Sequence, residues 1–202
     1  MALIFSLVIA YLLGSISFSY FIGKKVANID IRKHGSGNAG ATNTLRVLGK
    51  GPAILVLVLD ALKAVVAMLI THWITGGDPL AYALAGIFAI IGHNWPIFFG
   101  FRGGKGIATA IGVVIAISPS AFIAAAILAV LAIAITRYVS LGSLIFVTAV
   151  PLGFVYFDVH PATIWVSLLI TIFAYVRHYQ NIINLIQGKE RKLGDQSGRN
   201  LR

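Results

Sequence analysis

Long apolar runs dominate this chain, and polar positions interrupt them only at intervals. A helix needs about 20 mostly apolar residues to cross the hydrocarbon core of a bilayer. Five runs of roughly this length are clear, at residues 3–23, 52–73, 80–99, 138–157 and 162–182. The pattern therefore predicts an all-α, polytopic membrane protein, with one domain over residues 1–193.

The stretch 107–136 is also apolar but carries Ser118 and Pro119 near its middle. Because proline stops or kinks a helix, this stretch is either one kinked helix or two short ones. Two helices give seven transmembrane spans, and one helix gives six. Segment 107–117 covers only about 17 Å of helix against a hydrocarbon core of about 30 Å, which leaves a full span and a buried half-span both open.

The distribution of charge favours seven spans. With seven, every Lys and Arg falls in loops on one side of the membrane, and the opposite loops carry only Asp78, Asp158, His72 and His160. With six, Arg137 and the basic tail change sides. Basic residues collect in cytoplasmic loops, so we predict an outside N-terminus and a cytoplasmic C-terminus.

Composition supports a membrane setting. Hydrophobic residues make up 58% of the chain, charged residues 11%, and the mean hydropathy is +0.92, whereas soluble domains are about 25% charged. The net charge of +10 is therefore assigned to cytoplasmic loops, and no nucleic-acid partner is expected. Cysteine is absent, which excludes disulfide, zinc–thiolate and thiol-nucleophile chemistry.

The two ends of the chain need separate interpretation. Residues 1–23 lack the basic n-region of a secretory signal, and Gly14 with its neighbouring serines suits close helix packing, so a retained span is expected. The tail 194–202 is polar and without pattern, and it is set apart as partly an expression remnant.

The first predicted cytoplasmic loop, 34–46, has the composition of an anion site. Its glycines let the backbone bring N–H groups close to a ligand, Ser36 adds a hydroxyl, and Arg46 adds a fixed, bidentate charge. The loop's candidate substrate-binding residues are Gly37, Asn38, Gly40, Ala41, Thr42 and Asn43. A dinucleotide fingerprint needs a preceding strand, which is not predicted; a flexible connector is the simpler alternative.

A second loop, 101–106, places Gly103, Gly104 and the bases Arg102 and Lys105 directly before an apolar helix. Backbone amides at a helix N-terminus attract anions, so this loop is a second candidate phosphate cradle. The alternative is that its basic residues serve only to set the topology.

Polar residues inside the spans are further candidates. Asp60 and Lys63 stand three apart, which favours a structural salt bridge. His93 is either a packing residue or a site residue. Ser140 and Ser143 start a span as caps or back-bonding serines, and Ser143 is retained as a candidate substrate contact.

The last span ends with His178 and Asn181 on one helical face. A histidine at this interface donates, accepts or moves a proton near neutral pH. The alternative is a bland interfacial histidine, but its asparagine partner and the facing glycine loops favour a functional pair.

Eight short motifs carry a resemblance that runs in order along nearly the whole chain. They are YLLGS at 11–15, HGSGN at 34–38, GATN at 40–43, DxxK at 60–63, GH at 92–93, FRGGKG at 101–106, SLGS at 140–143 and RHxxN at 177–181. They resemble the acyl-phosphate-dependent glycerol-3-phosphate acyltransferases of bacterial inner membranes, the PlsY family. The chain departs from the family pattern at Ala39, Ala64 and Arg102.

The resemblance implies a seven-span enzyme with a cytoplasmic active site. It would transfer a fatty acyl group from acyl phosphate to the sn-1 hydroxyl of glycerol 3-phosphate, giving 1-acyl-glycerol 3-phosphate and phosphate. The residues expected to carry catalysis are Ser36, Arg46, Lys105, His178 and Asn181. No cofactor or metal is expected, and the oligomeric state stays open.

Missing motifs narrow the mechanism. The chain contains no His-x₄-Asp, no Gly-x-Ser-x-Gly and no cysteine, so a covalent acyl-enzyme has no obvious nucleophile. Direct attack by the glycerol hydroxyl on the acyl carbonyl is therefore expected. The rival interpretations are a transporter or channel for phosphorylated metabolites, which needs a continuous polar path, and a structural assembly protein, which leaves the loops unexplained.

Overall fold

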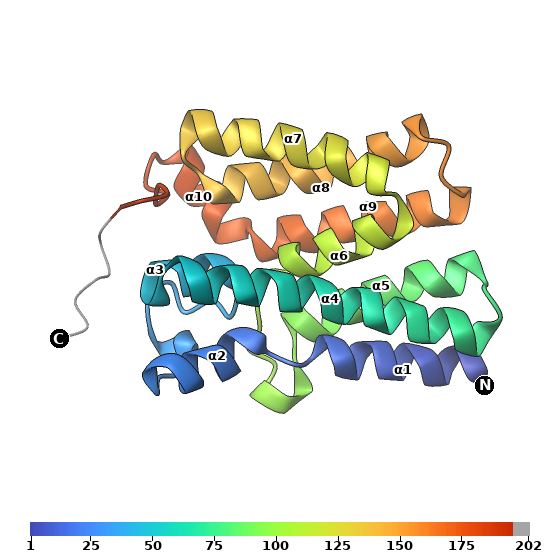
Figure 1. Cartoon of the computed structure of the whole chain (residues 1–202). Helices are drawn as coiled ribbons and strands as arrows, with labels where there is room; N and C mark the ends of the chain where they lie inside the picture. Colours follow the sequence, from blue (N-terminus) through green and yellow to red (C-terminus); the bar gives the residue numbers. More distant parts are fainter. Residues whose placement is uncertain (196–202) are drawn as a thin grey trace.

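The computed structural model describes residues 1–195, and this part of the chain is all-helical, as predicted (Figure 1). The elements are α1 (Ala2–Gly14), α2 (Phe18–Ala27), η1 (Ile31–Lys33), α3 (Ala41–Leu48), α4 (Lys50–Thr75), α5 (Pro79–Asn94), η2 (Ile97–Phe99), α6 (Ile107–Ile117), α7 (Pro119–Thr136), α8 (Val139–Tyr156), α9 (Pro161–Arg177) and α10 (Tyr179–Ile186). Most of the predicted tail, from 196 onward, lies outside the described residues.

The long helices form two groups of three. Helices α1, α4 and α5 pack together, as do α7, α8 and α9, and the short α6 lies between the groups in contact with both (Figure 1). Small residues allow close approach of the backbones. A Cβ atom on Gly92 of α5 would collide with the Tyr11 carbonyl of α1, and one on Gly112 of α6 would collide with the Ala61 carbonyl of α4.

The length and apolarity of the helices confirm a polytopic membrane protein. Five segments are long and apolar enough to cross a bilayer: Ala2–Ala27, Lys50–Thr75, Pro79–Phe99, Pro119–Thr136 and Val139–Tyr156. Helices α9 and α10 make a sixth if they count as one span with a 62° bend. Helix α6, at 11 residues, is shorter than a full span.

Several predicted runs contain breaks. The stretch 107–136 is two helices, as the proline suggested: Ser118 caps α7 by accepting a hydrogen bond from the Ala121 N–H at 3.2 Å, and Pro119 occupies its first turn. The runs 3–23 and 162–182 were expected to be continuous but are not. The first breaks between Gly14 and Phe18, and the second bends at His178.

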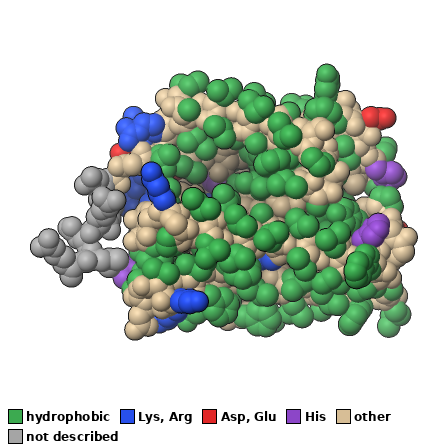
Figure 2. Space-filling model, in the orientation of Figure 1, with side chains coloured by type: hydrophobic (Ala, Val, Ile, Leu, Met, Phe, Trp, Pro, Cys, Tyr) green, Lys and Arg blue, Asp and Glu red, His purple; other side chains and the backbone are tan. Residues whose placement is uncertain are grey.

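The surface reflects this organisation. Figure 2 shows hydrophobic side chains over the flanks of the helices and most of the visible Lys and Arg at the end of the molecule that holds α2, α3 and α10. Acidic and histidine side chains are visible at both ends, with almost no Lys or Arg beside those at the opposite end. The basic end also carries the two glycine-rich loops. The predicted segregation of charge is therefore present in the fold.

Candidate functional site

A cavity of about 1060 Å³ opens at the basic end and continues between the helices. Its polar lining includes the five residues expected to carry catalysis: Ser36, Arg46, Lys105, His178 and Asn181. Asn38, Gly40, Ala41, Thr42, Asn43 and Ser143 also line it. Gly37, Gly103 and Gly104 are not part of the lining formed by residues 1–195.

The first loop is shaped from within by Asn43. Its amide nitrogen donates to the carbonyls of Ile31 and His34 at 3.1 and 3.0 Å, and its amide oxygen accepts from the Ser36 N–H at 2.8 Å. Gly35 has φ +63°, and a Cβ there would collide with the Asn43 side chain. Asn43 therefore holds the loop around Ser36, and its polar atoms are already used in doing so.

Helix α3 carries the loop into the cavity. The first backbone N–H groups of a helix have no intrahelical acceptor, and in α3 the N-cap residue Gly40 supplies no side-chain acceptor for them. Arg46 lies in its last turn and lines the cavity. The arrangement offers unpaired amides and a guanidinium on the same side, which is a favourable setting for an anion.

Lys105 lines the cavity and belongs to a series of hydrogen-bonded polar side chains. Its amine donates to the Asn181 amide oxygen, and the Asn181 amide nitrogen donates to a Glu190 carboxylate oxygen at 2.7 Å. Ser140 donates to the same oxygen at 2.7 Å. Burial, opposed by Glu190 and reinforced by nearby Arg46, lowers the pKa of the Lys105 amine to about 8.

Glu190 is a residue that the sequence analysis missed. It follows α10 within a run of basic residues, so it was grouped with the topology signals, yet its side chain is buried and lines the cavity. The available signal was a single acidic residue among three bases, which is weak. Ser140, expected to be a cap or a back-bonding serine, is its other partner.

His178 sits at the bend between α9 and α10 and is 3% exposed. Its Nδ1 lies 2.8 Å from the Ala174 carbonyl oxygen. A carbonyl only accepts, so Nδ1 carries a proton and donates it. In the neutral ring Nε2 is then an acceptor, available to a hydroxyl in the cavity that this side chain lines.

The glycines of the second loop serve packing. The Gly104 N–H donates to the His93 carbonyl at 3.0 Å, and a Cβ on Gly104 would collide with the His93 ring. The Arg177 guanidinium donates to the Gly104 carbonyl at 2.7 and 3.1 Å and lies over the Trp95 ring. The compactness of this loop presents Lys105 to the cavity, while Arg102 is exposed.

The predicted Asp60–Lys63 salt bridge is confirmed, with 2.7 Å between the Lys63 Nζ and the Asp60 Oδ1. Lys63 also lies 3.0 Å from the His93 Nδ1 and donates to the Ile16 carbonyl at 2.7 Å. The cluster therefore ties the break between α1 and α2 to α4 and to the end of α5. His93 belongs to this cluster, and both Asp60 and His93 also reach the cavity wall.

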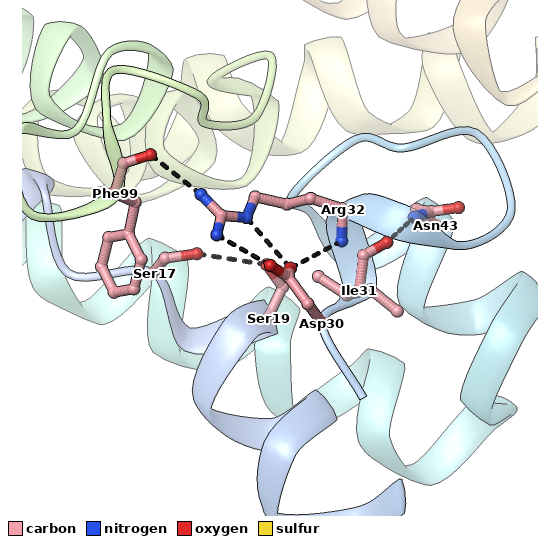
Figure 3. A network of polar contacts seen from close by, with 7 residues as sticks. All are labelled: Ser17, Ser19, Asp30, Ile31, Arg32, Asn43 and Phe99. Carbon is pink, nitrogen blue, oxygen red and sulfur yellow. Dashed lines mark hydrogen bonds and ion pairs between the residues drawn. The ribbon is translucent and has the colours of Figure 1, made fainter. Parts of the chain in front are cut away.

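A second polar network joins the two loops (Figure 3). Arg32 pairs with Asp30 at 2.8 Å, donates to the Phe99 carbonyl at 2.8 Å, and lies over the rings of Tyr20 and Phe99. The hydrogen bonds from Arg32 hold the pKa of the Asp30 carboxyl below its usual range, so the pair stays charged. Asn43 contacts the same segment through Ile31. The segments η1 and η2, which precede the two loops, are thus fixed to each other.

Within residues 1–195, no group of three His, Asp or Glu side chains is arranged to hold a metal ion. The polar end of the cavity instead gathers several cations, among them Arg46 and Lys105, with a hydroxyl, unpaired amides and a histidine acceptor. Such a set can bind phosphate groups and orient a hydroxyl.

Comparison with known proteins supports a site of this kind. The sequence profile described as glycerol-3-phosphate acyltransferase matches residues 4–188. A glycerol-3-phosphate acyltransferase of Halalkalibacterium halodurans is 54% identical over 190 residues, covering 92% of each chain. One of Shouchella clausii is 52% identical over 198 residues, covering 96% of this chain and 97% of the relative.

Solved structures agree. The crystal structure of PlsY (YgiH), an integral membrane glycerol 3-phosphate acyltransferase in its glycerol 3-phosphate form, matches with a TM-score of 0.90 at 37% identity and covers 98% of both chains. Its lysophosphatidic acid form matches with a TM-score of 0.88, also at 37% identity, over 96% of both chains. The chain therefore belongs to the PlsY family of integral membrane glycerol-3-phosphate acyltransferases.

Proposed function

We propose that this acyltransferase takes its acyl group from acyl phosphate and places it on the sn-1 hydroxyl of glycerol 3-phosphate, at the cytoplasmic face of a bacterial inner membrane. The observation that carries the proposal is one cavity with two kinds of wall. Arg46, Lys105 and His178 line its polar end, and side chains of α4, α6, α7 and α8 line an apolar continuation. A long-chain acyl phosphate likewise has a charged phosphate at one end and an apolar chain at the other.

The apolar part suits a chain that arrives from lipid. Leu57 of α4, Ile111 of α6, Val130 and Ile133 of α7 and Phe146 of α8 contribute to it. Of these, Leu57 and Val130 are also exposed, at 38% and 62%. An acyl chain can thus move from the bilayer into the groove between α4 and α7 without crossing water, which favours a membrane-borne donor.

In the proposed reaction, Arg46, Lys105 and Ser36 bind the phosphate groups and neutralise charge as it develops. The Nε2 of His178 accepts a hydrogen bond from the sn-1 hydroxyl and aims its oxygen at the acyl carbonyl. That oxygen forms the new C–O bond while the bond from the carbonyl carbon to phosphate breaks. Phosphate leaves with the hydroxyl proton, so 1-acyl-glycerol 3-phosphate and inorganic phosphate are the products.

Other residues of the cavity have supporting roles in this scheme. Asn181 and Glu190 hold the Lys105 amine at the cavity, and the N–H groups of Ala41 and Thr42 add donors for phosphate. The reaction is accelerated by holding the substrates close together and by stabilising the charge that develops. It needs no protein nucleophile and no resident metal. A transporter with the same basic loops is the alternative, which family membership does not favour.

The topology belongs to the same proposal. Counting α6 with the longer helices gives seven segments that alternate in direction, and the N-terminus then lies outside while both glycine-rich loops and α10 face the cytoplasm. The location of most Lys and Arg at that end supports this orientation.

The donor is tested by initial rates. Purified protein in detergent micelles with labelled glycerol 3-phosphate should form 1-acyl-glycerol 3-phosphate from acyl phosphate and give no product from acyl-CoA. Comparable rates with acyl-CoA would contradict the proposal. Uptake of labelled glycerol 3-phosphate by proteoliposomes without an acyl donor would instead favour the transporter.

A further inference from the structure

The apolar part of the cavity has an aromatic end. Phe122 in the first turn of α7 and Phe146 of α8 both line it, and their ring centroids are 6.2 Å apart with the planes at 71°. Along α7 and α8 these are the lining residues farthest from the polar end. Phe146 is 3% exposed and Phe122 is half-buried.

The interior behind this pair is filled. Val114 of α6, Val150 and Phe154 of α8, and Ala121 of α7 are all buried and belong to the same core cluster as Phe146. Close-packed interiors of this kind do not yield to an extra methylene without displacing side chains. The two rings therefore close the groove in the direction in which an acyl chain would extend.

The groove has a definite length. Its lining on α7 begins near the polar end with Ile133, which packs beside Gly142, one residue before Ser143. From Ile133 to Phe122 the helix advances about 16 Å at 1.5 Å per residue. An extended chain advances roughly 1.2 Å per bond, the value for a fully extended polypeptide, so the groove accepts about 13 to 14 bonds of an alkyl chain.

We propose that Phe122 and Phe146 set the longest acyl chain that the enzyme transfers efficiently. This inference rests on the proposed function, in which the groove holds the acyl chain of the donor. The pair acts as a floor: chains that end above it fit, and longer chains must displace a ring or leave the groove.

The physics predicts the shape of the chain-length profile. Lipid tails are as apolar as the groove, so a methylene that moves from the bilayer into the groove gains little from the hydrophobic effect. The rate should therefore depend weakly on length until the chain reaches the floor. Beyond it, overpacking should lower kcat/KM by about 5-fold to more than 100-fold.

The experiment is a competition within one reaction. Purified enzyme in mixed micelles receives glycerol 3-phosphate and equimolar saturated acyl phosphates from about 12 to about 22 carbons, a range that brackets the estimated groove length. Mass spectrometry gives the ratio of the lysophosphatidic acid products. Because ratios do not depend on the amount of folded enzyme, partial loss of a variant does not distort the profile.

Three variants move the floor, and one control does not. Phe122→Ala and Phe146→Ala should each extend the limit by about three to four carbons, the depth of a removed ring. Ala126→Phe, one turn nearer the polar end, should shorten it by about five carbons. Leu128→Ala changes a residue of α7 that is 50% exposed and outside the cavity lining, so the profile should stay that of the wild type.

The opposite shifts distinguish a floor from general loosening of the bundle, which would move every variant the same way. An unchanged profile in Phe122→Ala, Phe146→Ala and Ala126→Phe would overturn the inference while leaving the proposed donor intact. Wild-type enzyme that makes no product from any acyl phosphate would overturn the proposed function itself.

Discussion

Lys105 depends on residues from three other parts of the chain. Asn181 of α10 accepts its hydrogen bond, Glu190 orients Asn181, and Ser140 of α8 fixes Glu190. The amine contacts a neutral amide rather than the carboxylate, so its charge is not cancelled by a direct ion pair. This arrangement keeps a buried cation in place and available for an incoming phosphate.

Lys105→Ala should therefore impair acyl transfer strongly. A charge-assisted hydrogen bond contributes about 1.5–3 kcal/mol, so kcat/KM for glycerol 3-phosphate should fall at least about 10- to 100-fold. The matched control is Arg102→Ala, which removes an exposed cation from the same loop and should retain nearly full activity. Equal losses in the two variants would mean that the loop contributes only general charge.

The pKa of Lys105 leads us to expect that acyl transfer depends on pH. Its pKa of about 8 in the free enzyme means that the amine is charged below pH 8 and progressively neutral above it. The kcat/KM for glycerol 3-phosphate should therefore fall above about pH 8, because this parameter reports ionisation of the free enzyme. In Lys105→Arg the decline should move to higher pH, since guanidinium stays charged. The same decline in both enzymes would assign it to another group.

Which residues line the cavity was partly predictable where a side-chain type has few uses. Arg46, Lys105 and His178 were expected at a site because cations and a histidine next to glycine-rich loops suit phosphate chemistry, and all three line the cavity. Glu190 was not, because its role depends on the chain returning toward α8 after α10. Gly103 and Gly104 were interpreted as a cradle, but the structure uses Gly104 for contact with His93, which sequence spacing cannot reveal.

At the scale of elements, close packing between α1 and α5 depends on glycine. Gly14 of α1 lies against the Ala89 carbonyl of α5, and Gly92 of α5 lies against the Tyr11 carbonyl of α1, so closely that a Cβ at either position would collide with it. Between membrane helices the contact itself supplies the stability, because burial from lipid adds little. The positions of α1 and α5 in turn determine where the second loop begins.

Gly92→Ala should lower thermal stability in detergent, because one methyl group forces the two backbones apart. Gly51→Ala is the matched control. Gly51 lies in the first turn of α4 with open space around its Cβ direction, so alanine there should be neutral or stabilising through helix propensity. Monodisperse protein remaining after heating, measured by size-exclusion chromatography, gives both values. A Gly92→Ala protein as stable as the control would contradict the packing argument.

Most helices followed from the apolar runs, and the break at Ser118 followed from proline. The break between Gly14 and Phe18 did not, because that segment contains no proline and its small residues are common within membrane helices. A tertiary contact supports it, in which Lys63 donates a hydrogen bond to the Ile16 carbonyl. The bend at His178 has a similar origin, since the residues after it must meet Lys105.

At the scale of the molecule, α6 links the two helix groups and determines where the cavity lies. Because α6 has only 11 residues, α4 and α7 are separated beside it, and the groove occupies that space. A full-length helix in this position would bring more side chains between them. The short segment that complicated the count of spans is therefore the feature that makes room for the proposed acyl chain.

The proposed topology gives the last prediction. The sequence has no cysteine, so single-cysteine variants report one position each. Asp78 and Asp158 are exposed at one end of the bundle, and Lys50 and Arg137 are exposed at the other. With the N-terminus outside, Asp78→Cys and Asp158→Cys in intact cells should react with an impermeant thiol reagent. Lys50→Cys and Arg137→Cys should react only after the membrane is permeabilised, which also serves as the control for reactivity. External labelling of Arg137→Cys would mean that α6 and α7 do not form separate passes, and labelling of Lys50→Cys as well would reverse the whole orientation and place the cavity on the outer face.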